Sequence, residues 1–143
     1  MKTSHLVASI LSLVIMILPS CTKESSFEYD LYSIEGKWLV TSTTGKMVIG
    51  HDNVFAVNDT VRFLKDRYNH PLLYVSRPDE IRYIDEDRGI HFFLRLGYFP
   101  KEDNKSFDVF FNQTHTFELM KASKKRIVFR FADNGAKATL KEE

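Results

Sequence analysis

The amino-acid sequence predicts an all-β domain in which antiparallel strands follow one another as an up-and-down meander. Runs of β-branched and aromatic residues recur about every ten residues from residue 34 onwards, with Gly, Pro, Asn and Asp between them. Within several runs, apolar and polar residues alternate, as in strands with one buried face. All 12 Phe, all 6 Tyr and the single Trp follow Cys21. Because bulky side chains fill or line a small barrel, we expect a closed β-barrel, with a β-sandwich as the alternative.

Residues 1–20 have the order of a secretion signal. A short basic segment containing Lys2 is followed by an apolar run from Leu6 to Leu18 and then by small residues. As a helix, the apolar run would reach only about 20 Å, against a hydrocarbon core of about 30 Å. We therefore expect a cleaved signal peptide rather than a permanent membrane span.

Residues 18–21, Leu-Pro-Ser-Cys, resemble the lipobox of bacterial lipoproteins, in which the cysteine is acylated. The resemblance implies that Cys21 becomes the lipidated first residue of the mature chain and that this anchor attaches the protein to a membrane. The alternative is an ordinary secreted protein with a chance cysteine. Since Cys21 is the only cysteine, the exported domain can form no internal disulfide and must be stabilised by its core.

The residues after Cys21 bear on localisation. Thr22 stands where Asp would be the familiar signal for inner-membrane retention, so the chain resembles lipoproteins sent to the outer membrane. Lys23-Glu24 partly resembles the Lys-plus-acidic motif that marks some lipoproteins of anaerobic gut bacteria for the cell surface. Cell-surface and periplasm-facing orientations both remain open. The polar residues suit a tether, so we expect a tether over 21–33 and the barrel domain over 34–143.

Strand signals then follow in order along the domain. The later runs are the clearest, with Phe107, Val109 and Phe111 on one side of their strand. Residues 59–68 fit either a strand that begins at Thr60 or a helix capped by Asp59. The expected strands are 38–43, 47–49, 54–57, 60–64, 72–76, 80–84, 90–96, 107–111, 117–119 and 127–131.

The segment Ile34-Glu35-Gly36-Lys37-Trp38 resembles the Gly-x-Trp entry motif of lipocalins and of bacterial lipocalin-like domains. In that motif, Gly36 lets the chain turn into the barrel and Trp38 covers its closed end with one large ring. Residues 117–131 resemble the last hairpin of such domains, and Arg130 is a candidate to pack on Trp38. The resemblance implies either a small hydrophobic ligand inside or at the mouth of the barrel, or a filled barrel that serves as a scaffold.

No residue pattern predicts catalysis, so we expect a non-enzymatic protein without a cofactor. The segment 85–87, Asp-Glu-Asp, lacks the spaced ligands of a calcium loop and fits an acidic turn. Thr60, within Asp59-Thr60-Val61, resembles an O-glycosylation site of exported proteins, although an edge-strand Thr explains it equally. The histidines show no metal-ligand spacing and are expected in turns or at the surface; they are His5, His51, His70, His91 and His115.

Charge excludes one class of partner. Loss of Lys2 with the signal leaves 19 basic residues against the 19 acidic ones, and a neutral balance does not indicate nucleic-acid binding.

Two functions remain open. One is an envelope lipoprotein that binds a small hydrophobic ligand, which needs a cavity. The other is a structural or protein-interaction lipoprotein, which needs an exposed aromatic patch on the outer surface. Phe93, Phe110 and Met120 fall opposite the main apolar face of their strands and are candidates for such a patch.

Overall fold

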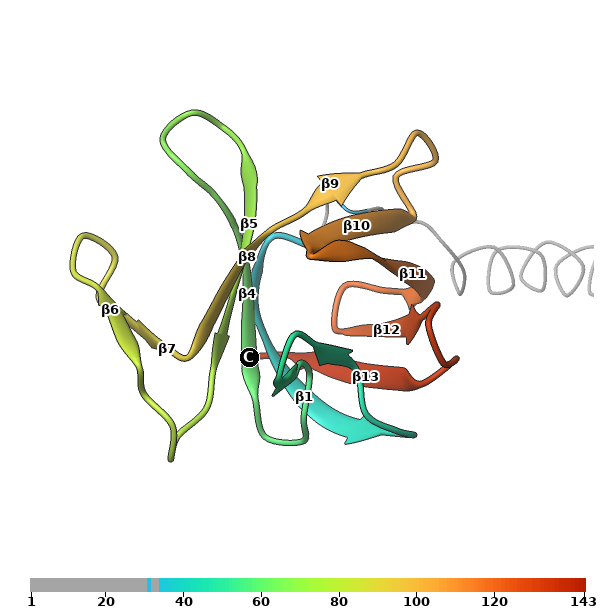
Figure 1. Cartoon of the computed structure of the whole chain (residues 1–143), viewed down its shortest axis with the longest axis horizontal. Coiled ribbons are helices and arrows are strands. Elements are labelled where there is room, and N and C mark those ends of the chain that lie inside the picture. The colour runs from blue at the N-terminus through green and yellow to red at the C-terminus, as the bar shows by residue number, and fades with distance from the viewer. Residues whose placement is uncertain (1–30, 32–33) are drawn as a thin grey trace, which may run out of the picture.

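The computed structural model describes residue 31 and residues 34–143, and every regular element there is a β-strand (Figure 1). The proposed signal peptide, Cys21 and nearly all of the proposed tether lie outside the described residues. The strands are β1 (Gly36–Thr43), β2 (Val48–Ile49), β3 (Asp52–Asn53), β4 (Thr60–Lys65), β5 (Pro71–Ser76), β6 (Tyr83–Asp85), β7 (Ile90–Phe92), β8 (Leu94–Gly97), β9 (Phe99–Pro100), β10 (Ser106–Phe111), β11 (Gln113–Ala122), β12 (Arg126–Phe131) and β13 (Lys137–Glu142).

Nine of these strands form one antiparallel sheet in the order β8-β5-β4-β1-β13-β12-β11-β10-β9. The two edge strands, β8 and β9, are consecutive in the chain and separated only by Tyr98. The same stretch of chain therefore pairs with β5 through its first half and with β10 through its second half. This bent stretch brings the sheet round into a lipocalin-like barrel, and the prediction of an up-and-down barrel rather than a sandwich is confirmed.

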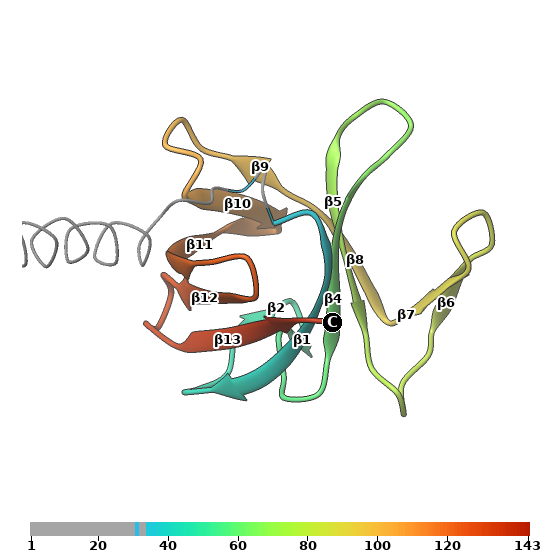
Figure 2. The same ribbon diagram turned by 180° about the vertical axis from the view of Figure 1, so that it is seen from behind.

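Two short hairpins interrupt the meander. The β2–β3 hairpin lies between β1 and β4 and packs at one end of the barrel. The β6–β7 hairpin lies between β5 and β8 and projects outwards from the side of the barrel (Figures 1 and 2). The β6–β7 hairpin therefore adds a two-stranded sheet to one side of the barrel.

The strand alternative for residues 59–68 is confirmed: they form β4 and a turn rather than a helix, because Val61 and Phe63 alternate into the core. The prediction of a strand over 54–57 was wrong. Residues 54–57 form a loop rather than a strand, in which Phe55 adopts a positive φ of 62°. The last strand, β13, was not expected from the sequence.

Aromatic rings fill the barrel interior. Phe107 stacks on Phe117 with ring centroids 5.1 Å apart and meets Phe129 edge-on at 5.4 Å. Phe55 contacts Phe117 at 5.3 Å, and Phe63 contacts Phe129 at 5.8 Å. All five rings are almost completely buried. The barrel is therefore packed by side chains in contact with one another.

Apolar side chains also cover both ends of the barrel. At the end where β1 begins, Trp38 is buried beside Ile34 and Leu31, and its Nε1 donates a hydrogen bond to the Ile34 carbonyl at 2.8 Å. At the opposite end, Met47 and Phe55 are buried beneath the loop that joins β1 to β4. Trp38 is therefore buried at one end of the barrel, as expected.

The expected contact between Arg130 and Trp38 does not form. Arg130 points to the outer face of β12, where Nη1 donates to Glu118 Oε1 at 2.9 Å on the neighbouring strand. Arg130 lies between the buried Phe129 and Phe131 on the strand, so its side chain points away from the interior.

Candidate functional site

A buried tyrosine faces outwards from β5. Leu73 and Val75 point into the barrel, so Tyr74 between them projects from the outer wall, yet it is fully buried. The β6–β7 hairpin covers it: the Phe92 ring meets the Tyr74 ring edge-on at 4.9 Å, and Ile90 belongs to the same apolar cluster. This cluster joins the hairpin to the barrel wall.

A hydrogen-bonded triad fixes the hairpin in place. The Tyr74 hydroxyl donates to Asp85 Oδ2 at 2.6 Å, and Arg88 Nη1 donates to the same oxygen at 3.0 Å. Arg88 also reaches the Lys65 carbonyl on β4 at 2.9 Å. The hydrogen bond from Tyr74 is the main cause that lowers the pKa of Asp85, whereas burial, followed by Asp85, raises the pKa of Tyr74. Asp85 is therefore an ionised acceptor at neutral pH.

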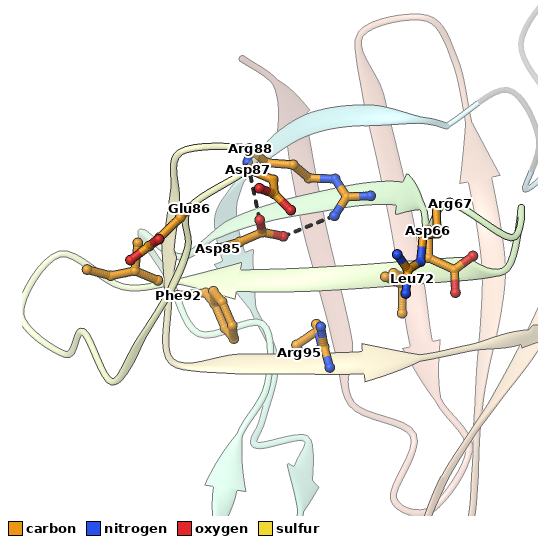
Figure 3. Close-up of a pocket in the computed structure, with 10 residues that line it drawn as sticks. Asp66, Arg67, Leu72, Asp85, Glu86, Asp87, Arg88, Phe92 and Arg95 are labelled. Atoms are coloured by element: carbon orange, nitrogen blue, oxygen red, sulfur yellow. Dashed lines mark hydrogen bonds and ion pairs between the residues drawn. The ribbon is translucent and has the colours of Figure 1, made fainter.

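A groove of about 720 Å³ opens between the hairpin and the turn that joins β4 to β5 (Figure 3). The hairpin contributes Asp85 and Arg88, β8 contributes Arg95, and the turn contributes Asp66 and Arg67. Asp66 also organises that turn, since its Oδ1 accepts backbone N–H bonds from residues 68 and 70 at 2.8 Å. The backbone N–H of residue 70 is the main cause that lowers the pKa of Asp66.

The groove carries charges of both signs. Its lining carboxylates are Asp66, Asp85, Glu86 and Asp87, and its guanidinium groups are Arg67, Arg88 and Arg95. Such a nearly balanced set does not select a purely anionic or purely cationic small molecule. It fits a partner that itself offers both signs of charge, as protein surfaces do.

The hairpin also exposes apolar side chains. Ile81, Tyr83 and Ile84 are each more than half exposed. Among the strands of the described chain, β6 pairs only with β7, so its other edge presents unpaired backbone N–H and C=O groups. The groove, the free edge and the apolar side chains together form the hairpin surface.

Neither Tyr74 nor Arg88 was identified from the sequence. The signal for Tyr74 was its position between two inward-facing apolar residues, because an aromatic on the outer parity of a strand needs a cover. Phe93 was expected on the outer surface, but it is buried. The Arg77 guanidinium stacks on its ring, with Cζ 4.1 Å from the ring centroid. Phe110 is indeed exposed, and Met120 is half-buried.

The other predicted site residues lie apart from this groove. Gly36 begins β1 with a φ of 129°, and Trp38 follows it in the core. Thr60 is the first residue of β4 and is half-buried between Leu39 and Ser76. Thr60 and the Gly36–Trp38 motif therefore belong to the barrel wall and its end.

The histidines are partly as expected. His51, His70 and His91 are exposed, whereas His5 lies outside the described residues. His115 was wrongly placed among the surface histidines: it is buried, and its Nδ1 lies 2.7 Å from Asp133 Oδ2. Its parity with Phe117 and Leu119 along β11 was the signal for burial.

Among the described residues, no three His, Cys, Asp or Glu side chains come close enough together to hold a metal ion. No helix of the length and hydropathy needed to span a bilayer occurs in residue 31 or residues 34–143. Fold and site define a small antiparallel β-barrel with a packed interior and a hairpin attached to its outer wall. The chain matches no family model, and neither a curated protein nor a solved structure is detectably similar to it.

Proposed function

We propose that this chain is a non-enzymatic lipoprotein of the bacterial outer membrane, anchored through Cys21, that binds a protein partner on the outer wall of its barrel. The observation that carries the proposal is the packing of the interior. A hydrophobic ligand would have to displace rings that already contact one another, such as Phe107 and Phe117. Close-packed cores accommodate added volume only at a cost in stability, so the outer surface is the better binding site.

The hairpin surface has the chemistry of a protein interface. Interfaces combine an apolar centre that favours Tyr and Arg with a polar rim. Here Tyr83 and Ile84, on opposite faces of β6, supply exposed apolar side chains, and the charged groove residues beside Ile84 supply the polar rim. The free edge of β6 can accept an extended segment of the partner as an added strand. The partner we propose is therefore an envelope protein that offers an extended apolar segment flanked by charges.

Photo-crosslinking in cells tests the partner. A photoreactive residue in place of Tyr83 should give one discrete crosslinked product, and the additional change Ile84→Asp should remove that product. The same photoreactive residue in place of Lys121, which is exposed on β11 away from the hairpin, serves as the matched control. A product that is equally strong at Lys121, or that survives Ile84→Asp, would contradict binding through the hairpin surface.

The anchor is tested separately. Each buried methylene contributes about 0.8 kcal/mol to membrane attachment, so an acylated Cys21 should hold the protein firmly in the membrane fraction. Cys21→Ala should either release the domain or stall its processing, and it should abolish labelling by a radioactive fatty acid. Unchanged labelling of the variant would show that the lipid is not on Cys21.

A lipophilic probe distinguishes the alternative function. If the barrel interior binds such a molecule, titration should change the emission of Trp38 saturably. We expect no saturable change, because the interior side chains leave no room for the probe.

A further inference from the structure

A second groove, of about 340 Å³, lies at the barrel end opposite Trp38. On one side it is bounded by Val48 and Gly50, at the β2–β3 hairpin. On the other side it is bounded by the tip of the β10–β11 hairpin, where Phe111 pairs with Gln113 across a single residue. Its volume is at the lower end of the roughly 300–1,000 Å³ typical of small-molecule sites.

The groove contains a buried imidazole with one nitrogen available. His115 is 4% exposed, and its ring stacks on Phe131 with centroids 5.7 Å apart. Its Nδ1 lies 2.7 Å from Asp133 Oδ2. An ionised carboxylate can only accept, so Nδ1 donates this hydrogen bond, and in the tautomer with a single ring proton Nε2 is an acceptor. Nε2 has no hydrogen-bond partner among the residues that the structure describes.

An aromatic ring lines the same groove. Phe111 is 44% exposed, so a large part of its surface is open to solvent. The ring is positioned by Gly50, where an added Cβ would lie 2.6 Å from Phe111 Cε1. Gly50 also has a φ of 64°, which favours glycine. The ring therefore stands ready without needing a ligand to order it.

The remaining lining is polar and carries no positive charge. Asn112 and Gln113 contribute side-chain amides, which both donate and accept hydrogen bonds. Asp133 contributes the one carboxylate, and neither Lys nor Arg is among the lining residues. A phosphate or carboxylate ligand would find no cation here, so the groove fits a neutral molecule with many hydroxyl groups and one apolar face.

We infer that this groove binds a neutral carbohydrate, with one pyranose ring against Phe111 and a sugar hydroxyl donating to Nε2 of His115. The C–H face of a pyranose suits the electron-rich face of an aromatic ring. Its hydroxyl groups, as both donors and acceptors, match the amides of Asn112 and Gln113. The inference does not depend on the hairpin surface or on a protein partner.

Saturation-transfer NMR on the purified full-length chain tests it, with maltotriose, mannotriose and chitotriose as probes at ~10 mM. At least one of them should receive magnetisation on its ring C–H protons. Phe111→Leu should weaken binding about tenfold and Phe111→Tyr should retain it, because only the second keeps an aromatic face. His115→Leu should weaken binding several-fold through loss of the acceptor.

Phe110→Ala is the matched control, since Phe110 is 67% exposed but lies on the opposite parity of the same strand. It should bind like the parent chain. Glucuronic acid should bind far more weakly than glucose, since the groove has no cation. The inference is overturned if none of the three neutral sugars binds the parent chain, if Phe111→Leu binds as well as the parent while Trp38 emission shows it folded, or if glucuronic acid binds as well as glucose.

Discussion

Arg77 binds the buried carboxylate of Asp59 through two parallel hydrogen bonds, from Nε at 2.7 Å and from Nη2 at 2.8 Å. The Asp59 side chain is 1% exposed. Asp59 Oδ2 also accepts the backbone N–H of Ala56, and Arg77 Nη2 reaches the carbonyl of Asn53. The pair thereby ties the end of β5 to the loop that inserts Phe55 into the barrel.

Arg77→Met should destabilise the domain by about 3–5 kcal/mol, because it leaves the Asp59 carboxylate buried without its partner. Urea unfolding followed by Trp38 fluorescence measures the loss. Arg82→Met is the control: Arg82 is 40% exposed and pairs with Asp52, so its removal should cost no more than about 1 kcal/mol. Equal losses of unfolding free energy in Arg77→Met and Arg82→Met would show that the burial of Asp59 does not determine the cost of removing its partner.

Trp38→Ala should cost about 3–5 kcal/mol, since it removes a buried ring and leaves a cavity. Trp38→Phe should be milder, because it keeps most of the volume. As the only Trp, Trp38 should emit at blue-shifted wavelengths in the folded chain and shift to the red on unfolding. Emission like that of free indole in the native protein would contradict its burial.

The hydrogen bond between Tyr74 and Asp85 should make the stability of the domain depend on pH in the acidic range. The pKa of Asp85 is lowered in the folded chain, so the folded state binds this proton less readily than the unfolded state does. The stabilisation is complete above the unfolded pKa of about 3.9 and is lost as the pH falls through the lower, folded value. Tyr74→Phe should therefore be less stable at neutral pH and lose less stability below about pH 4. If the free energy of unfolding falls with pH equally in the parent chain and in Tyr74→Phe, this hydrogen bond is not the cause of the acid dependence.

Tyr98 should produce the corresponding effect in alkali. Burial raises the pKa of Tyr98 from 10.0 to about 12. The unfolded chain releases this proton at a lower pH than the folded chain, so stability is complete below pH 10 and falls as the pH rises to about 12. The loss can approach about 1.4 kcal/mol per pH unit. In Tyr98→Phe, the free energy of unfolding measured between these two pH values should depend less on pH. At neutral pH it should change little.

Period-two alternation carried most of the fold prediction. Residues 107–109 and 127–131 alternate, and the structure places them in β10 and β12 with Phe107, Phe129 and Phe131 inside. The burial of Trp38 followed from one large ring at the start of the first strand. These features were predictable because they depend on local sequence and on which face of a strand meets the core.

The failures came from contacts between distant parts of the chain. Residues 54–57 look like a short apolar strand, but Phe55 turns inwards at a positive φ, and an apolar run of that length does not reveal this. Asp59, which directly precedes β4, resembled a helix cap, whereas its partner Arg77 directly follows β5, 18 residues further along the chain. The grooves were likewise hidden, since each is lined by residues from separate elements that only the folded chain brings together.

The pairing of β1 with β13 has a consequence for how the protein is made. Trp38 lies opposite Glu142, so the first and the last strand of the domain are neighbours, and the ring is completed only when the last residues join. A chain that emerges N-terminus first from a ribosome must therefore wait with β1 unpaired on that side until β13 has emerged. Contacts between such distant parts of a sequence slow the final step, and an open strand edge invites association with other chains in the meantime. Loss of β13 should accordingly produce aggregation rather than a smaller soluble barrel.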